Sequence, residues 1–207
     1  IRTGGLSEKS YKTLKTATNN QLDTEKELTK LYTHNYDVDR INAEHLATLS
    51  GKTQIHQAKT KGNKKLIDTL KNSVLASENL ELKMGARVMF VKNNLEKAYV
   101  NGSLGEVIGF TEDGLPSVKL VYNKKVILVE PEDWSISDDN GKTLASYTQL
   151  PLRLAWAITV HKCQGMTLDA AEIDLSKTFE NGQGYVALSR LKKLENLKLL
   201  GLNEQAL

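Results

Sequence analysis

Short β-branched stretches separated by turn-forming pairs fill the middle of the chain, and this pattern constrains the fold more than any other feature. The stretches lie between residues 83 and 149, at 87–91, 106–110, 118–122 and 126–129. Four turn pairs lie between or after them: Asn101-Gly102, Asp113-Gly114, Asn123-Lys124 and Asn140-Gly141. Closely spaced short strands with tight turns are typical of a small β-barrel or sandwich. We therefore expect a small β-barrel over residues 83–149.

The two flanking segments predict alternating helices and strands. Residues 7–17 predict a helix with Ser7 as its N-cap, and residues 28–33 predict a strand. A second helix begins at Asn35 or Asp37, has apolar positions about every 3.6 residues and ends at Ser50-Gly51. Further strands are expected at 171–175 and 197–202. The predicted fold class is therefore α/β, with a domain formed by residues 1–82 and 150–207 and interrupted by the small β-barrel insertion at 83–149.

Composition adds a few limits. The formal net charge of +3 over 207 residues does not by itself indicate a nucleic-acid-binding protein, so any DNA contact must come from local placement. No apolar run approaches the roughly 20 residues of a membrane span. The single cysteine, Cys163, cannot form an internal disulfide, which favours a reducing, cytoplasmic location. Because the chain starts at Ile1 without a signal-peptide pattern, we expect a fragment of a longer protein.

Residues 154–165, LAWAITVHKCQG, form the first segment that could carry chemistry. Alternating apolar residues from Leu152 to Ile158 suit a strand, although the alanines among them leave a helix open. A polar turn at the carboxyl end of a strand is where open α/β sheets bind ligands. Lys162 offers a point charge for phosphate, and Gln164 can both donate and accept hydrogen bonds. The alternative is an ordinary surface turn with a packed histidine.

Residues 184–190, GYVALSR, form the second such segment. Tyr185, Leu188 and Leu191 share one helical face, and Arg190 can close a local ion pair or project toward a neighbouring domain. The four histidines have no metal-ligand spacing with Cys163, so the sequence predicts no metal site.

Together the two segments resemble motifs V and VI of superfamily 1 nucleic-acid helicases, in the Pif and RecD-like branch. The likeness extends over residues 171–190, and residues 83–110 resemble the Src-homology-like barrel that is inserted in the second motor domain of these enzymes. The resemblance implies a RecA-like parallel-sheet domain and an ATP-dependent DNA helicase that translocates 5′ to 3′ on single-stranded DNA and unwinds duplex. It also implies ATP and Mg²⁺, bound mainly by a first RecA-like domain of the same parent chain, and roles in DNA repair and recombination.

The resemblance also assigns site residues. It makes Arg190 the arginine finger, whose effect is worth roughly 10³–10⁵ in rate for such residues generally. Gln164 couples DNA contact to the nucleotide, and Gly165 and Gln183 lie in the nucleotide cleft with Arg190. The implied DNA contacts come from the motif V turn and from the barrel: Thr159, His161, Lys162, Lys92 and Lys97. Cys163 replaces the serine commonly found in this turn, and a thiol is the weaker hydrogen-bond donor.

Ser50-Gly51-Lys52-Thr53 has the ending of a phosphate-binding P-loop but lacks its context. The pattern needs a glycine where this chain has Leu46, and a strand where this chain predicts a helix. We interpret the segment as a helix C-cap. With neither a P-loop nor a convincing Walker B acidic pair, we expect the chain by itself to have no ATPase activity.

Two other functions fit the same motifs. The chain can be the helicase portion of a conjugative relaxase or of a RecD-type nuclease subunit, since these share the motor motifs. It can also be a non-catalytic nucleic-acid-binding module whose barrel binds and whose motor part is only structural.

Overall fold

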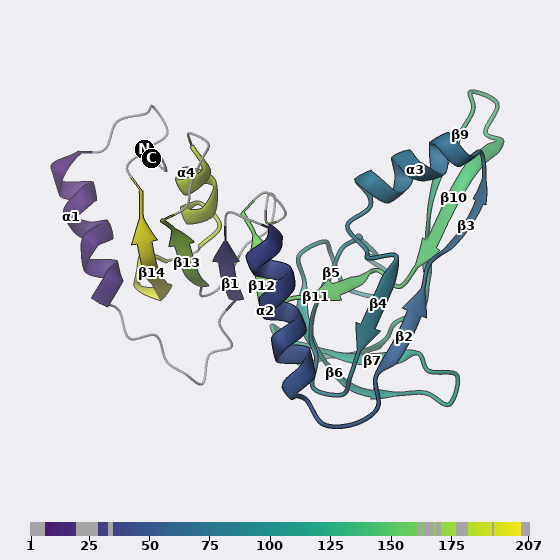
Figure 1. The fold of residues 1–207 in the computed structure, drawn as a ribbon, viewed down its shortest axis with the longest axis horizontal. Coiled ribbons are helices and arrows are strands. Elements are labelled where there is room, and N and C mark those ends of the chain that lie inside the picture. Colours follow the sequence, from purple (N-terminus) through teal and green to yellow (C-terminus); the bar gives the residue numbers. More distant parts are fainter. Residues whose placement is uncertain are drawn as a thin grey trace. The chain divides into compact units, whose positions relative to one another are not determined.

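Two separate units make up the chain in the computed structural model, which describes residues 7–19, 29–32, 35–160, 163, 168, 171–176, 182–191 and 193–203 (Figure 1). The first unit comprises Ile1–His45 and Ala155–Leu207, and the second comprises Leu46–Leu154. Among the described residues, no helix combines the length and the apolar character that crossing a membrane requires.

The first unit is built on a parallel sheet. Its four strands lie in the order β12-β1-β13-β14, and all three pairings between them are parallel. This sheet confirms the predicted α/β class, and the strands expected at 171–175 and 197–202 are present with those bounds. The elements of this unit are α1 (Glu8–Thr16), η1 (Ala17–Asn19), β1 (Thr29–Tyr32), α2 (Asn35–Thr48), β12 (Ala157–Thr159), β13 (Ala171–Leu175), α4 (Gln183–Leu188), η3 (Leu194–Asn196) and β14 (Leu197–Leu202).

Helix α2 packs on this sheet through the apolar positions that its sequence predicts. Val38 and Ile41 are buried and form a cluster with Ala157 of β12. Asn42 adds a polar contact on the same side: its amide donates to the Ala157 carbonyl and accepts from the Ala157 N–H, each at 3.0 Å. The helix ends before Gly51, whose φ of +96° is the left-handed conformation expected of a glycine that stops a helix.

The second unit is made of antiparallel sheets. One has five strands in the order β11-β5-β6-β7-β8, one has three in the order β3-β10-β9, and β2 pairs with β4. The four predicted turns are confirmed, because the second residue of each pair has a positive φ: Gly102, Gly114, Lys124 and Gly141. The elements are β2 (Gln54–Gln57), β3 (Lys59–Gly62), α3 (Lys64–Ser73), β4 (Asn79–Leu82), β5 (Arg87–Phe90), β6 (Leu104–Phe110), β7 (Pro116–Leu120), β8 (Val126–Leu128), β9 (Glu132–Ser137), β10 (Thr143–Gln149) and β11 (Leu152–Leu154).

Residues 46–82 belong to the second unit, whereas the sequence pattern groups them with the α/β part. Strand β3 pairs with β10, and α3 buries Leu70 against Ala145 and Tyr147 of the same strand β10. These elements give a weak sequence signal because β3, KTKG, is exposed along its whole length and so shows no apolar alternation.

The predicted single strand over 152–158 is instead two strands in different sheets. Strand β11 pairs with β5, and β12 pairs with β1. Between them Ala155 and Trp156 are outside any strand, and the Trp156 ring stacks on His45 with centroids 5.5 Å apart. Apolar residues alternate through both strands, so the sequence pattern does not reveal that the chain passes from one sheet to the other.

Candidate nucleotide and nucleic-acid interface

Strand β12 positions the turn that carries the first predicted motif. All three of its residues are buried, and its last residue, Thr159, is opposite Tyr32 of β1 with a side chain only 2% exposed. The pairing continues one residue further, where the Val160 N–H donates to the Tyr32 carbonyl at 2.9 Å. Thr159 therefore fixes where the turn leaves the sheet. Of the turn itself, His161, Lys162, Gln164 and Gly165 lie outside the described residues.

Cys163 is the described residue within this turn, and it is fully buried. Its thiol donates to the Val160 carbonyl at 2.9 Å. Burial raises the pKa of Cys163 to about 11, and the positive charge of Arg190 acts in the opposite direction. The thiol is therefore protonated at neutral pH and stabilises the turn. The buried thiol therefore interacts electrostatically with Arg190 of the second predicted motif.

Arg190 follows helix α4 and is held by local contacts. Its Nε donates to the Val186 carbonyl at 3.1 Å, and one Nη donates to the Ser189 hydroxyl at 2.9 Å. Its carbonyl accepts from the N–H of Leu168 at 2.8 Å, and Leu168 forms a parallel bridge with Leu191. The backbone of Arg190 is thus tied to the segment that follows the motif V turn. The guanidinium is half-buried, which strengthens its interaction with any nearby negative charge.

Helix α4 begins at Gln183, which the resemblance places in the nucleotide cleft. Gly182 precedes it with a φ of +83°, so the chain turns sharply into the helix. Gln183 is only 4% exposed and is one of three buried residues of α4, with Gly184 and Ala187. Tyr185, on the face predicted from the apolar spacing, is 38% exposed instead.

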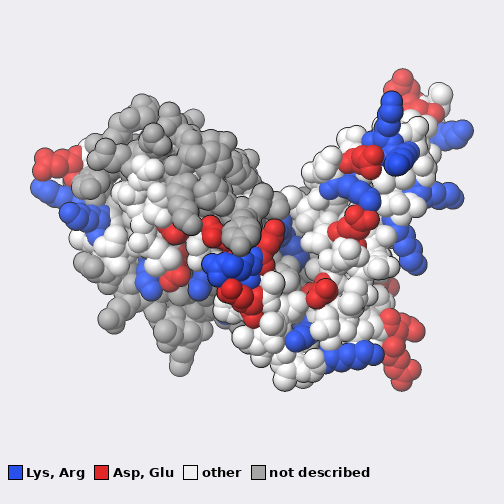
Figure 2. Space-filling model, in the orientation of Figure 1, with Lys and Arg blue, Asp and Glu red and all other residues white. Residues whose placement is uncertain are grey.

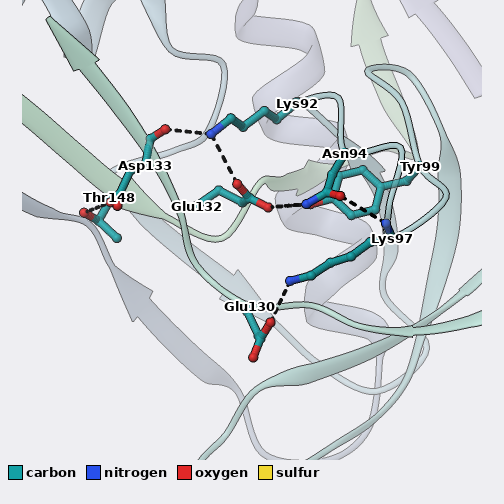
Figure 3. A network of polar contacts seen from close by, with 8 residues as sticks. All are labelled: Lys92, Asn94, Lys97, Tyr99, Glu130, Glu132, Asp133 and Thr148. Atoms are coloured by element: carbon teal, nitrogen blue, oxygen red, sulfur yellow. Dashed lines mark hydrogen bonds and ion pairs between the residues drawn. The ribbon is translucent and has the colours of Figure 1, made fainter. Parts of the chain in front are cut away.

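The two lysines predicted to contact DNA from the barrel form ion pairs within the second unit (Figure 3). The Nζ of Lys92 lies 3.2 Å from Glu132 Oε2 and 2.6 Å from the Asp133 carbonyl. The Nζ of Lys97 lies 2.6 Å from Glu130 Oε2. Their charges are therefore balanced locally, which weakens the attraction they offer to a phosphate.

Glu132 is the centre of this network, and no sequence pattern indicates it. Asn94 and Tyr99 both donate to its Oε1, at 2.8 and 3.1 Å. Burial alone would raise the pKa of Glu132, but the hydrogen bonds from Asn94, Lys92 and Tyr99 together lower it below its ordinary value. Burial and the Glu132 charge raise the pKa of Tyr99, so its hydroxyl remains a donor. The carboxylate holds the loop between β5 and β6 to the start of β9.

A row of three charged residues crosses the parallel sheet, and no sequence pattern predicted it. Glu172 of β13 lies between Lys30 of β1 and Lys198 of β14 in the strand register, with N–O distances of 3.9 and 3.2 Å. Residues from three strands make this row, so only the sheet order reveals it. Among the described residues, no cluster of His, Cys, Asp or Glu could hold a metal ion.

Comparisons with known proteins give a consistent result. The family model for the 2B domain of the DNA helicase Pif1 matches residues 65–110. The ATP-dependent DNA helicase Pif1 of Psychrobacter is 47% identical over 235 residues, which cover 89% of this chain and 36% of that protein. Unliganded Pif1 from Bacteroides has a TM-score of 0.79 at 32% identity, covering 97% of this chain and 47% of that one. A Bacteroides Pif1 structure in complex with ADP-AlF3 and ssDNA has a TM-score of 0.72 at 32% identity, covering 100% of this chain and 48% of that one.

The parallel sheet with its helices, together with these neighbours, defines a RecA-like α/β fold. The chain belongs to the Pif1-like family of superfamily 1 DNA helicases, as the motif V and motif VI segments predict. It spans about a third of the length of the Psychrobacter relative and about half of the solved Bacteroides chains.

Proposed function

We propose that the chain is the second motor domain, with its barrel insertion, of an ATP-dependent helicase that translocates on single-stranded DNA and unwinds duplex. The observation that carries the proposal is the adjacency of the two motifs. The Arg190 carbonyl binds the Leu168 N–H, and the Arg190 charge acts on the buried Cys163 thiol. A change at the DNA-contacting turn can therefore reach the arginine through the charge interaction with Cys163 and through the hydrogen bond at Leu168, which follows the turn. The Pif1 relatives, which are named as ATP-dependent DNA helicases, support the same function.

In this proposal ATP binds between this chain and a first RecA-like domain that carries the P-loop and holds Mg²⁺. Arg190 stabilises the charge that develops on the transferred phosphoryl group, and Gln164 couples this step to DNA contact. Gly165 and Gln183 shape the same cleft. The neighbour solved with ADP-AlF3 and ssDNA supports nucleotide use by this fold.

The DNA track in this proposal runs past the motif V turn. His161 and Lys162 contact the phosphates, and the buried Thr159 contributes by positioning the turn. Lys92 and Lys97 are the weaker contributors because each already has a carboxylate partner.

Substitution of Arg190 in the full-length parent protein tests the proposal. We expect Arg190→Ala to lower the rate of DNA-stimulated ATP hydrolysis by roughly 10³-fold or more, with single-stranded DNA affinity retained. Arg190→Lys should restore little of the hydrolysis rate, because an ammonium group lacks the planar, bidentate geometry of the guanidinium. Lys193→Ala is the control, since Lys193 is exposed and pairs with the exposed Glu195.

Two results would contradict this function. One is a normal hydrolysis rate in Arg190→Ala. The other is measurable ATP turnover by the 207-residue chain alone, since the proposed nucleotide site needs the first motor domain. A passive DNA-binding module would show the first of these results together with unchanged DNA binding.

A further inference from the structure

A run of lysines without acidic partners lies on the edge of the second unit. Lys59 and Lys61 of β3 and Lys64 and Lys65 of α3 are all exposed, and none has an ion-pair partner among the described residues. No acidic residue occurs between positions 58 and 67. We name these four residues the β3 lysine edge. In Figure 2, Lys and Arg side chains follow the edge on which Figure 1 shows β3.

The backbone of this edge is fixed by its neighbours. Gly62 has a φ of +108°, and a Cβ at this position would overlap the Leu144 carbonyl. Asn63 then caps α3, accepting from the N–H groups of Lys65 and Leu66 at 3.0 and 3.4 Å. The four lysines therefore start from defined backbone positions, two on strand β3 and two in the first turn of α3.

The sheet formed by β3, β10 and β9 has one covered face and one open face. Helix α3 covers the first, where Tyr147 is buried and Trp134 is half-buried. On the other face, Lys59 is opposite Thr148 and Lys61 is opposite Ser146, which in turn is opposite Ser135. A hollow of about 410 Å³ lies here, lined by Lys61, Gly62, Asp133, Ser135, Thr143, Leu144, Ala145 and Ser146.

Ammonium groups beside hydroxyls suit the phosphates of a nucleic acid. Lysine, serine and threonine side chains are among the usual donors to phosphate oxygens. Along β3, Lys59 and Lys61 point to the same face about 7 Å apart. Proteins that bind single strands stack bases on aromatic rings, yet the two aromatic residues of this sheet, Trp134 and Tyr147, are on the covered face. The open face can therefore bind a phosphate backbone, but it has no aromatic ring on which an unpaired base could stack.

We propose that the β3 lysine edge and the adjoining hydroxyl-bearing face form a docking surface for the phosphate backbone of duplex DNA. The choice of DNA rests on the proposed function. Asp133 is the carboxylate on this face, and it accepts a hydrogen bond from the Thr148 hydroxyl. Its negative charge opposes docking, so it sets the affinity lower than the lysines alone would give.

Lysines on an edge strand also have a purely structural role. They prevent the exposed strand from pairing with another sheet edge. If this were their only role, neutralising them would cause self-association and leave DNA affinity unchanged. Measuring the oligomeric state of each variant by light scattering separates the two roles.

The test measures fluorescence anisotropy of a short blunt duplex and of oligo(dT) of equal length, each titrated with the 207-residue chain over a range of salt. Lys59→Gln/Lys61→Gln should weaken duplex binding several-fold and reduce the slope of log affinity against log salt by about 2. Lys119→Gln/Lys125→Gln removes the same charge from two other exposed positions, one on β7 and one just before β8. It should change the duplex affinity and the salt slope much less. Asp133→Asn should tighten duplex binding, since the amide oxygen can still accept from Thr148.

The proposal is overturned if the wild-type chain does not bind duplex at low salt, or if the two double variants lose affinity equally. It is also overturned if binding of oligo(dT) falls as much as binding of duplex in the Lys59→Gln/Lys61→Gln chain. Failure of the proposed function gives a different result. The wild-type chain would then not bind oligo(dT), although it would still bind duplex and the lysine variants would still weaken that binding.

Discussion

At the scale of single residues, burial and charge decide what the candidate site can do. Cys163 is fully buried, and its thiol donates to the Val160 carbonyl. Arg190 is half-buried and donates to Val186 and Ser189, and its charge acts on that thiol. Cys163 and Arg190 are therefore linked electrostatically. A substitution at either residue is expected to affect the other.

The reactivity of Cys163 measures how well the fold shields its thiol from solvent. Because burial raises its pKa to about 11, the thiol is protonated at neutral pH, and only its thiolate reacts. We expect a thiol reagent to label the native chain far more slowly than the urea-unfolded chain. Burial of the neutral Cys163 thiol also makes the free energy of unfolding depend on pH. Its contribution is fully present below the ordinary pKa of 9.0 and is lost as the pH rises toward 11.

A matched control keeps one cysteine but moves it. Ser137→Cys in a Cys163→Ser background places the thiol at an exposed position and should label at the rate of a free thiol. Labelling of native Cys163 at that same rate would show that the turn is open and would contradict the buried geometry.

At the scale of elements, Glu132 joins the β5–β6 loop to strand β9. Lys92, Asn94 and Tyr99 all bind this one carboxylate (Figure 3). Three donors from one loop constrain it far more than a single surface ion pair does. The loop is therefore expected to keep its shape whether or not DNA is bound.

Stability measured against pH tests this role of Glu132. Its pKa in the folded chain is below the ordinary 4.5, so the stability it contributes is present above that pH and is lost as the pH falls through the folded value. In urea unfolding, Glu132→Gln should lower the free energy of unfolding at pH 7, and the difference from wild type should shrink below about pH 4.5. Glu130→Gln should cost no more than about 1 kcal/mol, as expected for an exposed ion pair. Equal effects of the two substitutions would contradict the central place of Glu132.

The elements that the sequence predicted are those with a repeating apolar pattern. The buried face of α2 and the strands β13 and β14 were predicted because their apolar residues recur at helical or strand spacing. Strand β3 was missed because all its residues are exposed. The break between β11 and β12 was missed because the apolar alternation continues through both strands. The role of Arg190 stays a prediction from its motif, whereas Glu132 has partners at distant positions that only the fold brings together.

At the scale of the whole molecule, we assign a different proposed site to each of the two units. The parallel-sheet unit carries the motif V turn and Arg190, and the antiparallel unit carries the β3 lysine edge. We propose that the first motor domain of the parent protein completes the nucleotide site. In the closed motor we expect Arg190 to reach the terminal phosphate of the nucleotide.

The most direct test is a structure of the full-length parent with single-stranded DNA and an ADP–aluminium fluoride complex that mimics the transferring phosphoryl group. We predict that the Arg190 guanidinium lies about 2.7–2.9 Å from the fluoride ligands, the distance of a charge-assisted hydrogen bond. A guanidinium that stays on Val186 and Ser189, pointing away from the nucleotide, would contradict the account.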